Sequence, residues 1–195
     1  MEATRGWVFD LDGTLTIAQH DFPAIRRELG IPAQDDILGH IAALAEPQRS
    51  EMSARLDAIE ERLADAVQPA LGAAELIHHL YRRGDRLGIL TRNLRSVALS
   101  SLRTLGVLDC YADEDILGRD EALPKPDPDG ILRLLRRWNL APAHAVMVGD
   151  FRFDLEAGRA AKCRTCLVHP ENAWPELADW HVMDCQAMLA HIENR

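Results

Sequence analysis

Two aspartates spaced two residues apart, Asp10 and Asp12, directly follow the apolar run at residues 7–9. In an extended chain, side chains two positions apart point to the same side, so both carboxylates are expected to converge at a strand end. Gly13 then permits a tight turn. Paired carboxylates can hold Mg²⁺, with one acid acting as nucleophile and the other as general acid–base. A solvated polar turn would have the same sequence, so this motif by itself leaves both interpretations open.

A threonine and a lysine further along the chain are candidate phosphate ligands. Thr91 ends the apolar run at residues 88–91, where its hydroxyl and nearby backbone N–H groups are suited to binding a phosphate. It is equally placed to cap a helix that begins near Leu94. Lys125 lies between two prolines, which stiffen the loop and restrict its ammonium group. An ordinary surface lysine is the alternative interpretation for Lys125.

A second pair of aspartates follows the apolar run at residues 145–148. Asp150 can complete a set of oxygen ligands for Mg²⁺ together with Asp10. Asp154 lies four residues later, where we expect it to support that site while capping the next helix. Two helix caps without a metal are the alternative, which fits Asp154 better than Asp150.

The elements that must position these residues follow from the alternation of short apolar runs with helical patterns, which predicts βαβ units and a parallel sheet. The predicted strands are residues 7–9, 87–90, 145–148 and 165–168, with 116–117 and 181–182 as weaker candidates. Apolar residues at helical spacing predict helices over 94–105 and 131–138. Asp127 is the expected N-cap of the second helix, with Pro128 at its first position.

The connection between the first two strands is too long for a simple crossover. A span of 81 residues separates Asp10 from Thr91, whereas a complete βαβ unit needs about 30. A helix over 73–83 can make the crossover, which leaves residues 16–68 as a helical insertion. We therefore predict a small helical cap at 16–68, and a core formed by 1–15 and 69–195. A helical elaboration that serves only stability is the alternative.

Composition limits the partners of this chain. Its 22 basic and 31 acidic residues give a net charge of −9, which argues against a broad nucleic-acid or membrane-surface binder. No stretch approaches the roughly 18 apolar residues of a membrane span, and no signal peptide fits the N-terminus, so a cytoplasmic location is expected.

Four cysteines are too few for a disulfide scaffold. Cys163 and Cys166 have CxxC spacing, but we interpret Cys166 as a strand residue rather than a zinc or redox site.

The motifs in their order resemble the haloacid dehalogenase-like hydrolase superfamily, in particular its phosphatases with a helical cap after the first motif. The shared order is D-x-D-G-T, a Thr after an apolar run, a Lys, and G-D-x-x-x-D. The segments Gly118-Arg-Asp120 and Lys125-Pro-Asp-Pro128 look like the subgroup that includes phosphoglycolate phosphatases. The resemblance implies a Rossmann-like, doubly wound parallel α/β sheet and Mg²⁺ as cofactor. It also implies that a small-molecule phosphate monoester is hydrolysed through an aspartyl-phosphate.

The resemblance also implies roles for single residues. Asp10 would be the nucleophile and Asp12 the general acid–base, while Thr91 and Lys125 would bind the transferring phosphoryl group. The Mg²⁺ site would consist of Asp10, Asp150 and Asp12, the last through its backbone carbonyl.

Two departures from the family pattern follow Thr91. Asn commonly comes next in relatives, but Arg92 intervenes here before Asn93, so both are candidate substrate contacts. No lysine lies between Asp12 and Thr91, which disfavours a Schiff-base phosphonatase. The second aspartate of the first motif favours phosphoryl transfer over carbon–halogen cleavage.

Three alternatives remain at this stage. They are a phosphomutase of the same family, a receiver-like signalling domain, and a non-catalytic phosphate-binding protein. We expect a monomer or weak dimer. The cap offers five candidate contacts to the leaving group, namely His20, Asp21, Arg26, Arg27 and His40.

Overall fold

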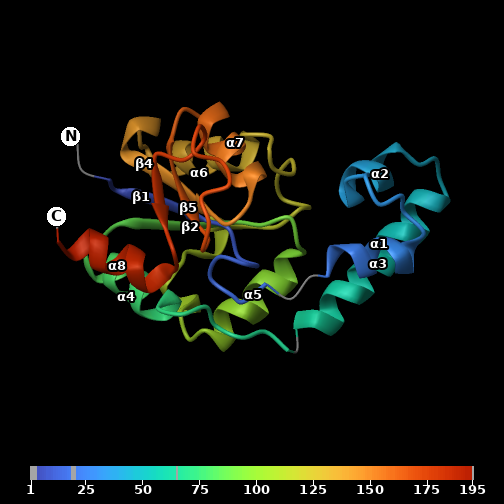
Figure 1. Cartoon of the computed structure of the whole chain (residues 1–195), viewed down its shortest axis with the longest axis horizontal. Coiled ribbons are helices and arrows are strands. Elements are labelled where there is room, and N and C mark those ends of the chain that lie inside the picture. Colours follow the sequence, from blue (N-terminus) through green and yellow to red (C-terminus); the bar gives the residue numbers. More distant parts are fainter. Residues whose placement is uncertain (1–3, 19–20, 65, 195) are drawn as a thin grey trace. The chain divides into compact units, whose positions relative to one another are not determined.

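The computed structural model describes residues 4–18, 21–64 and 66–194, and His20 lies outside these ranges. The chain divides into two compact units (Figure 1). The larger unit combines Met1–Ala18 with Val67–Arg195, and the smaller unit is Gln19–Ala66. Thr16 and Gln68, the predicted limits of the insertion, thus both group with the larger unit.

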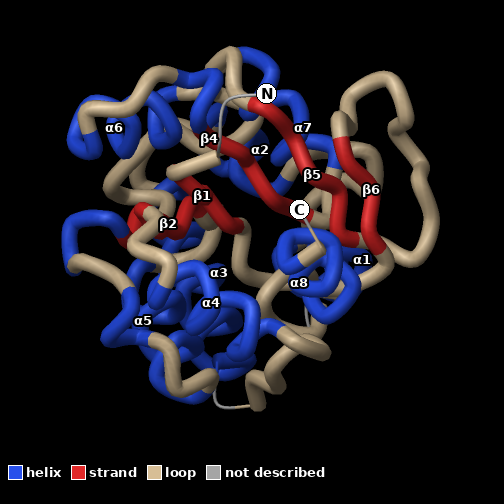
Figure 2. The backbone as a smooth tube through the Cα atoms, turned by 90° about the vertical axis from the view of Figure 1, so that its left-hand side faces the viewer, coloured by secondary structure: helices blue, strands red, loops and turns tan. Residues whose placement is uncertain are grey.

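A six-stranded parallel sheet forms the centre of the larger unit, in the order β3-β2-β1-β4-β5-β6. Figure 2 shows β2, β1, β4, β5 and β6 side by side. The strands of the described chain are β1 (Gly6–Phe9), β2 (Arg86–Leu90), β3 (Ile116–Leu117), β4 (Ala145–Gly149), β5 (Arg164–Val168) and β6 (Trp180–Val182). All six predicted strands are confirmed, including the two weaker ones, with ends within one residue of the prediction. Cys166 lies in β5, as expected.

Helices cover both faces of this sheet (Figure 1). One face carries α4 (Ala73–Arg82), α5 (Arg95–Thr104) and α8 (Cys185–Glu193), and the other carries α6 (Asp129–Trp138) and α7 (Arg152–Ala160). Side chains alternate along β1, so Trp7 and Phe9 enter the first core while Val8 enters the second. This arrangement confirms the predicted doubly wound α/β fold.

Two predicted helix N-caps are wrong. Helix α6 begins at Asp129 with Pro128 in the N-cap position, one residue later than expected. The Asp127 carboxylate still accepts the N–H of Asp129 at 2.9 Å, because it lies just ahead of the first turn. Helix α5 begins at Arg95 with Leu94 as its N-cap, so Thr91 lies too early to cap it.

The smaller unit is helical and has a core of its own. It contains α1 (Phe22–Leu29), α2 (Ile37–Ala43) and α3 (Gln48–Ala64). Their buried side chains form one apolar cluster, made of Ile25, Leu29, Ile31, Ile37, Ile41, Leu56 and Ile59. The amphipathic helices of this unit therefore bury their apolar faces against one another.

The two ends of the helical insertion are held together in the larger unit. Ile17 donates its N–H to the Gln68 carbonyl at 2.9 Å, and Ala70 donates to the Leu15 carbonyl at 2.9 Å. An antiparallel bridge joins Thr16 to Pro69. The chain therefore leaves the core and returns to it at one place, shortly after β1.

The structure also bears on the membrane and cysteine predictions. Among the described residues, no helix combines the length and apolar character that crossing a membrane requires. All four cysteines are free thiols, and none of them belongs to a cluster of metal-ligating side chains in the described part of the chain. The remaining short elements are 3₁₀ turns at Leu108–Cys110, Asp113–Asp115 and Pro142–His144.

Candidate active site

The ends of three neighbouring strands bring the predicted catalytic groups to one edge of the sheet. Asp10 directly follows β1 and donates its N–H to the Val148 carbonyl at 2.8 Å. Thr91 follows β2, and Asp150 follows β4. Because β1 lies between β2 and β4, Asp10 is flanked by the other two residues. Parallel α/β sheets bind ligands at this carboxyl edge.

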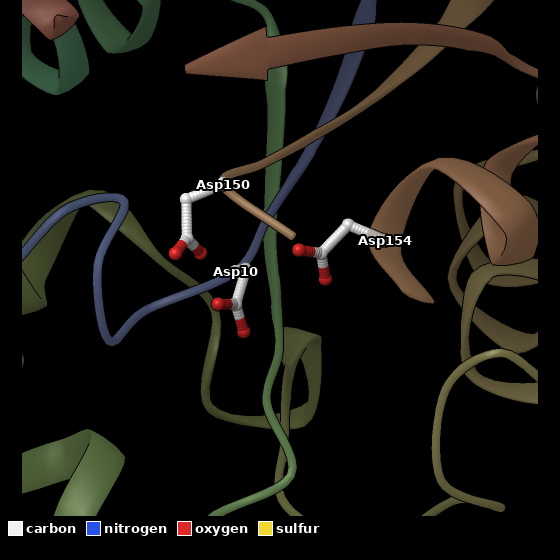
Figure 3. Close-up of side chains that lie close together, drawn as sticks. All are labelled: Asp10, Asp150 and Asp154. Atoms are coloured by element: carbon white, nitrogen blue, oxygen red, sulfur yellow. The ribbon is translucent and has the colours of Figure 1, made fainter. Parts of the chain in front are cut away.

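Three carboxylates converge there, as Figure 3 shows for Asp10, Asp150 and Asp154. Each offers one oxygen that lies within 4.8 Å of the other two. Asp154 reaches the group from the first turn of α7, where it also accepts the Phe151 N–H at 3.0 Å. Its expected helix-capping function is thereby confirmed.

The Asp12 carboxylate is not among the three that lie within 4.8 Å of one another, and its convergence with Asp10 stays a prediction. A turn follows Asp12 at residues 13–15. Leu15 and Thr16 both donate their N–H groups to the Leu11 carbonyl, at 2.9 and 3.0 Å. Asp12 itself forms an isolated bridge with Thr16, so the backbone is held on both sides of the turn.

Lys125 is buried inside the site. Its side chain is 3% exposed, and Nζ contacts Asp10 Oδ1 at 2.5 Å and Asp154 Oδ1 at 2.6 Å. The surface-lysine interpretation is therefore wrong. A single ammonium group links the end of β1, the loop before α6 and the first turn of α7, and offsets part of the negative charge gathered there.

Crowding and burial shift the acids of the site. Burial raises the pKa of Asp10 to about 6, with Lys125 opposing the shift and Asp154 adding to it. Burial, followed by the charges of Asp10 and Asp154, raises the pKa of Asp150 to about 8. Burial lowers the pKa of Lys125, but the adjacent Asp10 and Asp154 carboxylates outweigh it and leave this pKa raised. The site thus holds more negative charge than its single lysine balances.

The turn after β2 places the residues predicted to bind substrate. Thr91 is 4% exposed, and its Oγ1 accepts the Asn93 N–H at 3.2 Å. The Asn93 carbonyl in turn accepts the Arg119 N–H at 3.0 Å. Arg92 lies over the Phe153 ring, with its guanidinium carbon 5.0 Å from the ring centroid. Phe153 was not predicted as part of the site, because an aromatic residue in a helical first turn normally indicates packing.

Two further residues support the carboxylates and were also missed. Thr14 donates its hydroxyl to Asp150 Oδ1 at 3.2 Å. Gly13 has φ +86°, and a Cβ at this position would collide with the Asp150 carboxylate. Both residues belong to the D-x-D-G-T motif, in which Gly13 is predicted only to permit a tight turn and Thr14 has no predicted role.

The donor set fits a hard divalent cation. All three clustered side chains are carboxylates, the oxygen ligands that Mg²⁺ takes in proteins, and two of them have a raised pKa that a cation would lower. Asp154 is only 2% exposed, whereas Asp10 is 9% exposed and Asp150 is half-buried, so Asp10 and Asp150 are the side chains best suited to hold an ion. The set contains no thiolate or imidazole, which zinc usually prefers.

Comparisons with known proteins agree with this fold. The family model described as haloacid dehalogenase-like hydrolase matches residues 23–168. An uncharacterized hydrolase of Saccharomyces cerevisiae is 30% identical over 96% of this chain and 90% of its own length. The N-acetylmuramic acid 6-phosphate phosphatase of Pseudomonas putida is 32% identical over 86% of each chain.

Solved structures share the fold over nearly the whole chain. A hydrolase from Pseudomonas syringae superposes with a TM-score of 0.81 at 23% identity, covering 98% of this chain and 99% of its own. A Lactobacillus plantarum protein provisionally named phosphoglycolate phosphatase gives a TM-score of 0.77 at 22% identity, covering 97% and 99%.

The fold and the site define a hydrolase of the α/β class with an acidic centre at the carboxyl edge of its sheet. This chain belongs to the haloacid dehalogenase-like hydrolase family. The resemblance deduced from the motifs is thereby confirmed. Membership in a hydrolase family also disfavours the receiver-like and non-catalytic alternatives.

Proposed function

We propose that this protein is a Mg²⁺-dependent phosphatase that hydrolyses a small-molecule phosphate monoester through a phosphorylated Asp10. The observation that carries the proposal is the pairing of the buried Lys125 with Asp10 within a group of three carboxylates. A phosphatase relative at 32% identity supports the same conclusion. Phosphomutase activity, which needs a second substrate hydroxyl in place of water, has no observation in its favour.

The first step transfers the phosphoryl group to the enzyme. A carboxylate oxygen of Asp10 attacks phosphorus, and the bond from phosphorus to the ester oxygen breaks. Protonated Asp12 gives its proton to the departing alkoxide, which leaves as an alcohol. Lys125 and Thr91 face the oxygens of the transferring group and offset its negative charge.

The second step releases inorganic phosphate. Asp12, now ionised, removes a proton from water, and the resulting hydroxide attacks the phosphorus of phospho-Asp10. The bond between phosphorus and the Asp10 oxygen breaks, which regenerates both aspartates for another cycle. General acid–base catalysis of this kind contributes about 10²–10⁴-fold in rate.

The side chains of Asp10 and Asp150, with the backbone carbonyl of Asp12, would hold Mg²⁺. When bound, the ion supplies positive charge that lets an anionic nucleophile approach an anionic phosphate. Thr14 keeps Asp150 in place through its hydroxyl, and Asp154 keeps in place Lys125, which is the partner of Asp10.

We further propose that the helical unit selects the leaving group while the core performs the chemistry. Three of the predicted contacts in this unit already have structural partners. Asp21 caps α1 by accepting the Ala24 N–H, Arg26 donates to the Asp35 carbonyl, and His40 contacts the Asp35 carboxylate. Arg27, an exposed residue of α1, therefore replaces them as the first candidate in this unit.

A substrate screen tests the proposed function. The purified protein is incubated with Mg²⁺ and a panel containing phosphoglycolate, sugar phosphates and nucleoside monophosphates, and released phosphate is measured. We expect Mg²⁺-dependent hydrolysis of at least one carboxylate-bearing or sugar phosphate. Separately, we expect light scattering to show a monomer or weak dimer, and we expect the protein to be cytoplasmic. Hydrolysis that persists in excess EDTA would contradict the metal dependence.

A further inference from the structure

Four side chains form a continuous row of contacts beside the carboxylates. The Arg92 guanidinium carbon lies 5.0 Å from the centroid of the Phe153 ring. Phe153 meets Phe151 edge to face, with centroids 5.2 Å apart and an interplanar angle of 88°. Phe151 meets Trp174 in the same way, at 5.4 Å and 78°. We call Arg92, Phe153, Phe151 and Trp174 the aromatic row.

The aromatic row follows the carboxyl edge of the sheet and passes the reaction centre. Arg92 comes directly after the end of β2, and Phe151 and Phe153 come after the end of β4. Trp174 lies in the loop after β5. Since β1 lies between β2 and β4, the contact between Arg92 and Phe153 spans the strand that carries Asp10.

The three aromatic side chains of the row are not fully buried, although they are apolar. Phe151 is 49% exposed, Phe153 and Trp174 are half-buried, and none of the three belongs to the apolar clusters that flank the sheet. The backbone at Phe151 is fixed, because Asp154 accepts its N–H while also binding Lys125. An apolar surface held rigidly beside a catalytic centre indicates a binding surface.

The chemistry of the row indicates what it binds. Aromatic faces contact the apolar side of a ring or a branched carbon skeleton. A guanidinium stacked on an aromatic ring still presents its N–H donors in its own plane, where they match a carboxylate. In a chain with a net charge of −9, a negative group is attracted only where such a cation is placed locally.

We propose that the aromatic row binds the leaving group of the substrate, and that this leaving group is a ring-shaped or branched alcohol bearing a carboxylate. Phe151 and Trp174 contact its carbon skeleton, and Arg92 binds its carboxylate, with Phe153 holding Arg92 in position. The inference rests on the proposed phosphatase function and assigns part of the substrate selection to the core unit.

Three synthetic esters of similar intrinsic reactivity test this assignment, namely ethyl phosphate, benzyl phosphate and 4-carboxybenzyl phosphate. We expect kcat/KM of the wild type to rise in that order. Phe151→Ser and Trp174→Ala each lower the benzyl-to-ethyl ratio by about 2–10-fold, the value of one aromatic contact. Arg92→Met keeps the apolar stem and lowers the carboxybenzyl-to-benzyl ratio by about 10-fold or more, the value of a hydrogen bond to a charged group.

Two surface variants serve as matched controls. Tyr81 on α4 is 51% exposed, much like Phe151, and Arg103 on α5 is an exposed arginine. Tyr81→Ser and Arg103→Met leave both ratios unchanged, and thermal unfolding of all variants shows that they are folded.

The outcomes separate this inference from the proposed function. Ratios that stay constant in the row variants, or equal losses on all three esters, overturn the inference and leave the phosphatase function intact. A wild-type protein that hydrolyses none of the three esters with Mg²⁺, and none of the broader panel, overturns both.

Discussion

Negative charge is concentrated at Asp10, Asp150 and Asp154 more densely than one lysine can balance. This imbalance is the property on which the proposed chemistry depends. The imbalance favours binding of a divalent cation. It also repels an anionic phosphate from Asp10 unless additional positive charge is present. Residue-level variants test these roles separately.

Asp10→Asn should abolish hydrolysis of every ester. The change preserves the size of the side chain but removes the nucleophilic oxygen charge and one metal ligand. Phosphate release with Mg²⁺ measures the effect, and Asp109→Asn, at an exposed position far from the site in sequence, is the matched control. Full activity in Asp10→Asn would exclude a phosphorylated Asp10.

Asp12→Asn should separate acid–base catalysis from metal binding. Because the Asp12 carboxylate lies outside the three-carboxylate group, Mg²⁺ affinity measured by titration calorimetry should persist. The turnover number should fall by about 10²–10⁴-fold, and less for esters with good leaving groups. A loss of Mg²⁺ affinity as large as that in Asp150→Asn would instead make the Asp12 side chain a ligand.

Sequence reasoning selected the residues that the structure brings together but not their exact partners. Motif order was sufficient to select Asp10, Lys125 and Asp150, because residue type and position at strand ends limit the chemistry. It could not show how the turn after Asp12 is closed, since that depends on hydrogen bonds from Leu15 and Thr16 to the Leu11 carbonyl. The contact between Arg92 and Phe153 was equally hidden, because it joins segments 61 residues apart.

At the scale of elements, one buried ion pair network connects three segments. Lys125 comes from the loop before α6, Asp10 from the end of β1, and Asp154 from α7. The strands were predictable, because buried parallel strands appear as short apolar runs. The first residues of the helices were less predictable than the strands. The α6 start was misplaced by one residue, since Asp-Pro-Asp offers two acceptable first turns.

Lys125→Met should destabilise the protein strongly. Removing the ammonium leaves the Asp10 and Asp154 carboxylates buried without a partner, which costs about 3–5 kcal/mol in the free energy of unfolding. Urea unfolding in EDTA measures this cost.

Two further variants show whether that cost comes from the unpaired charges. Arg133→Met removes an exposed pair with Asp129 and should cost at most about 1 kcal/mol. Adding Asp154→Asn to Lys125→Met should restore part of the lost stability. A loss in Lys125→Met no larger than in Arg133→Met would show that the buried pairing contributes little.

At the scale of the whole molecule, the raised pKa values of Asp10 and Asp150 link folding, pH and metal. Both folded-state pKa values, about 6 and about 8, exceed the ordinary aspartate value of 3.8. The folded protein therefore holds these two protons more tightly than the unfolded chain. The resulting stability is complete below about pH 4 and is lost as the pH rises toward 8.

The metal-free protein should accordingly lose stability as the pH rises through this window, and Mg²⁺ should reverse the loss. Thermal unfolding with Mg²⁺ or EDTA, at about pH 5 and about pH 8.5, measures the difference. The increase in Tm due to Mg²⁺ should be larger at the higher pH, because the ion replaces protons at ionised carboxylates. Asp150→Asn should weaken this dependence. An equal Mg²⁺ effect at both pH values would contradict the linkage.

The paired ends of the helical insertion have a consequence for how such proteins diversify. Ile17 is hydrogen-bonded to Gln68, and Thr16 is bridged to Pro69, so the larger unit holds the two ends of the insertion side by side. Any insert at this place only has to begin and end at these paired residues. The entropy of closing a loop grows slowly with its length, so inserts of very different size cost the sheet nearly the same. A whole helical unit can thus be exchanged for another at this junction, as a loop is grafted. The carboxylates of the site and Lys125 keep their positions in such an exchange. Recombination at the paired residues 16–17 and 68–69 would then change which substrate is selected and leave the proposed catalytic residues unchanged.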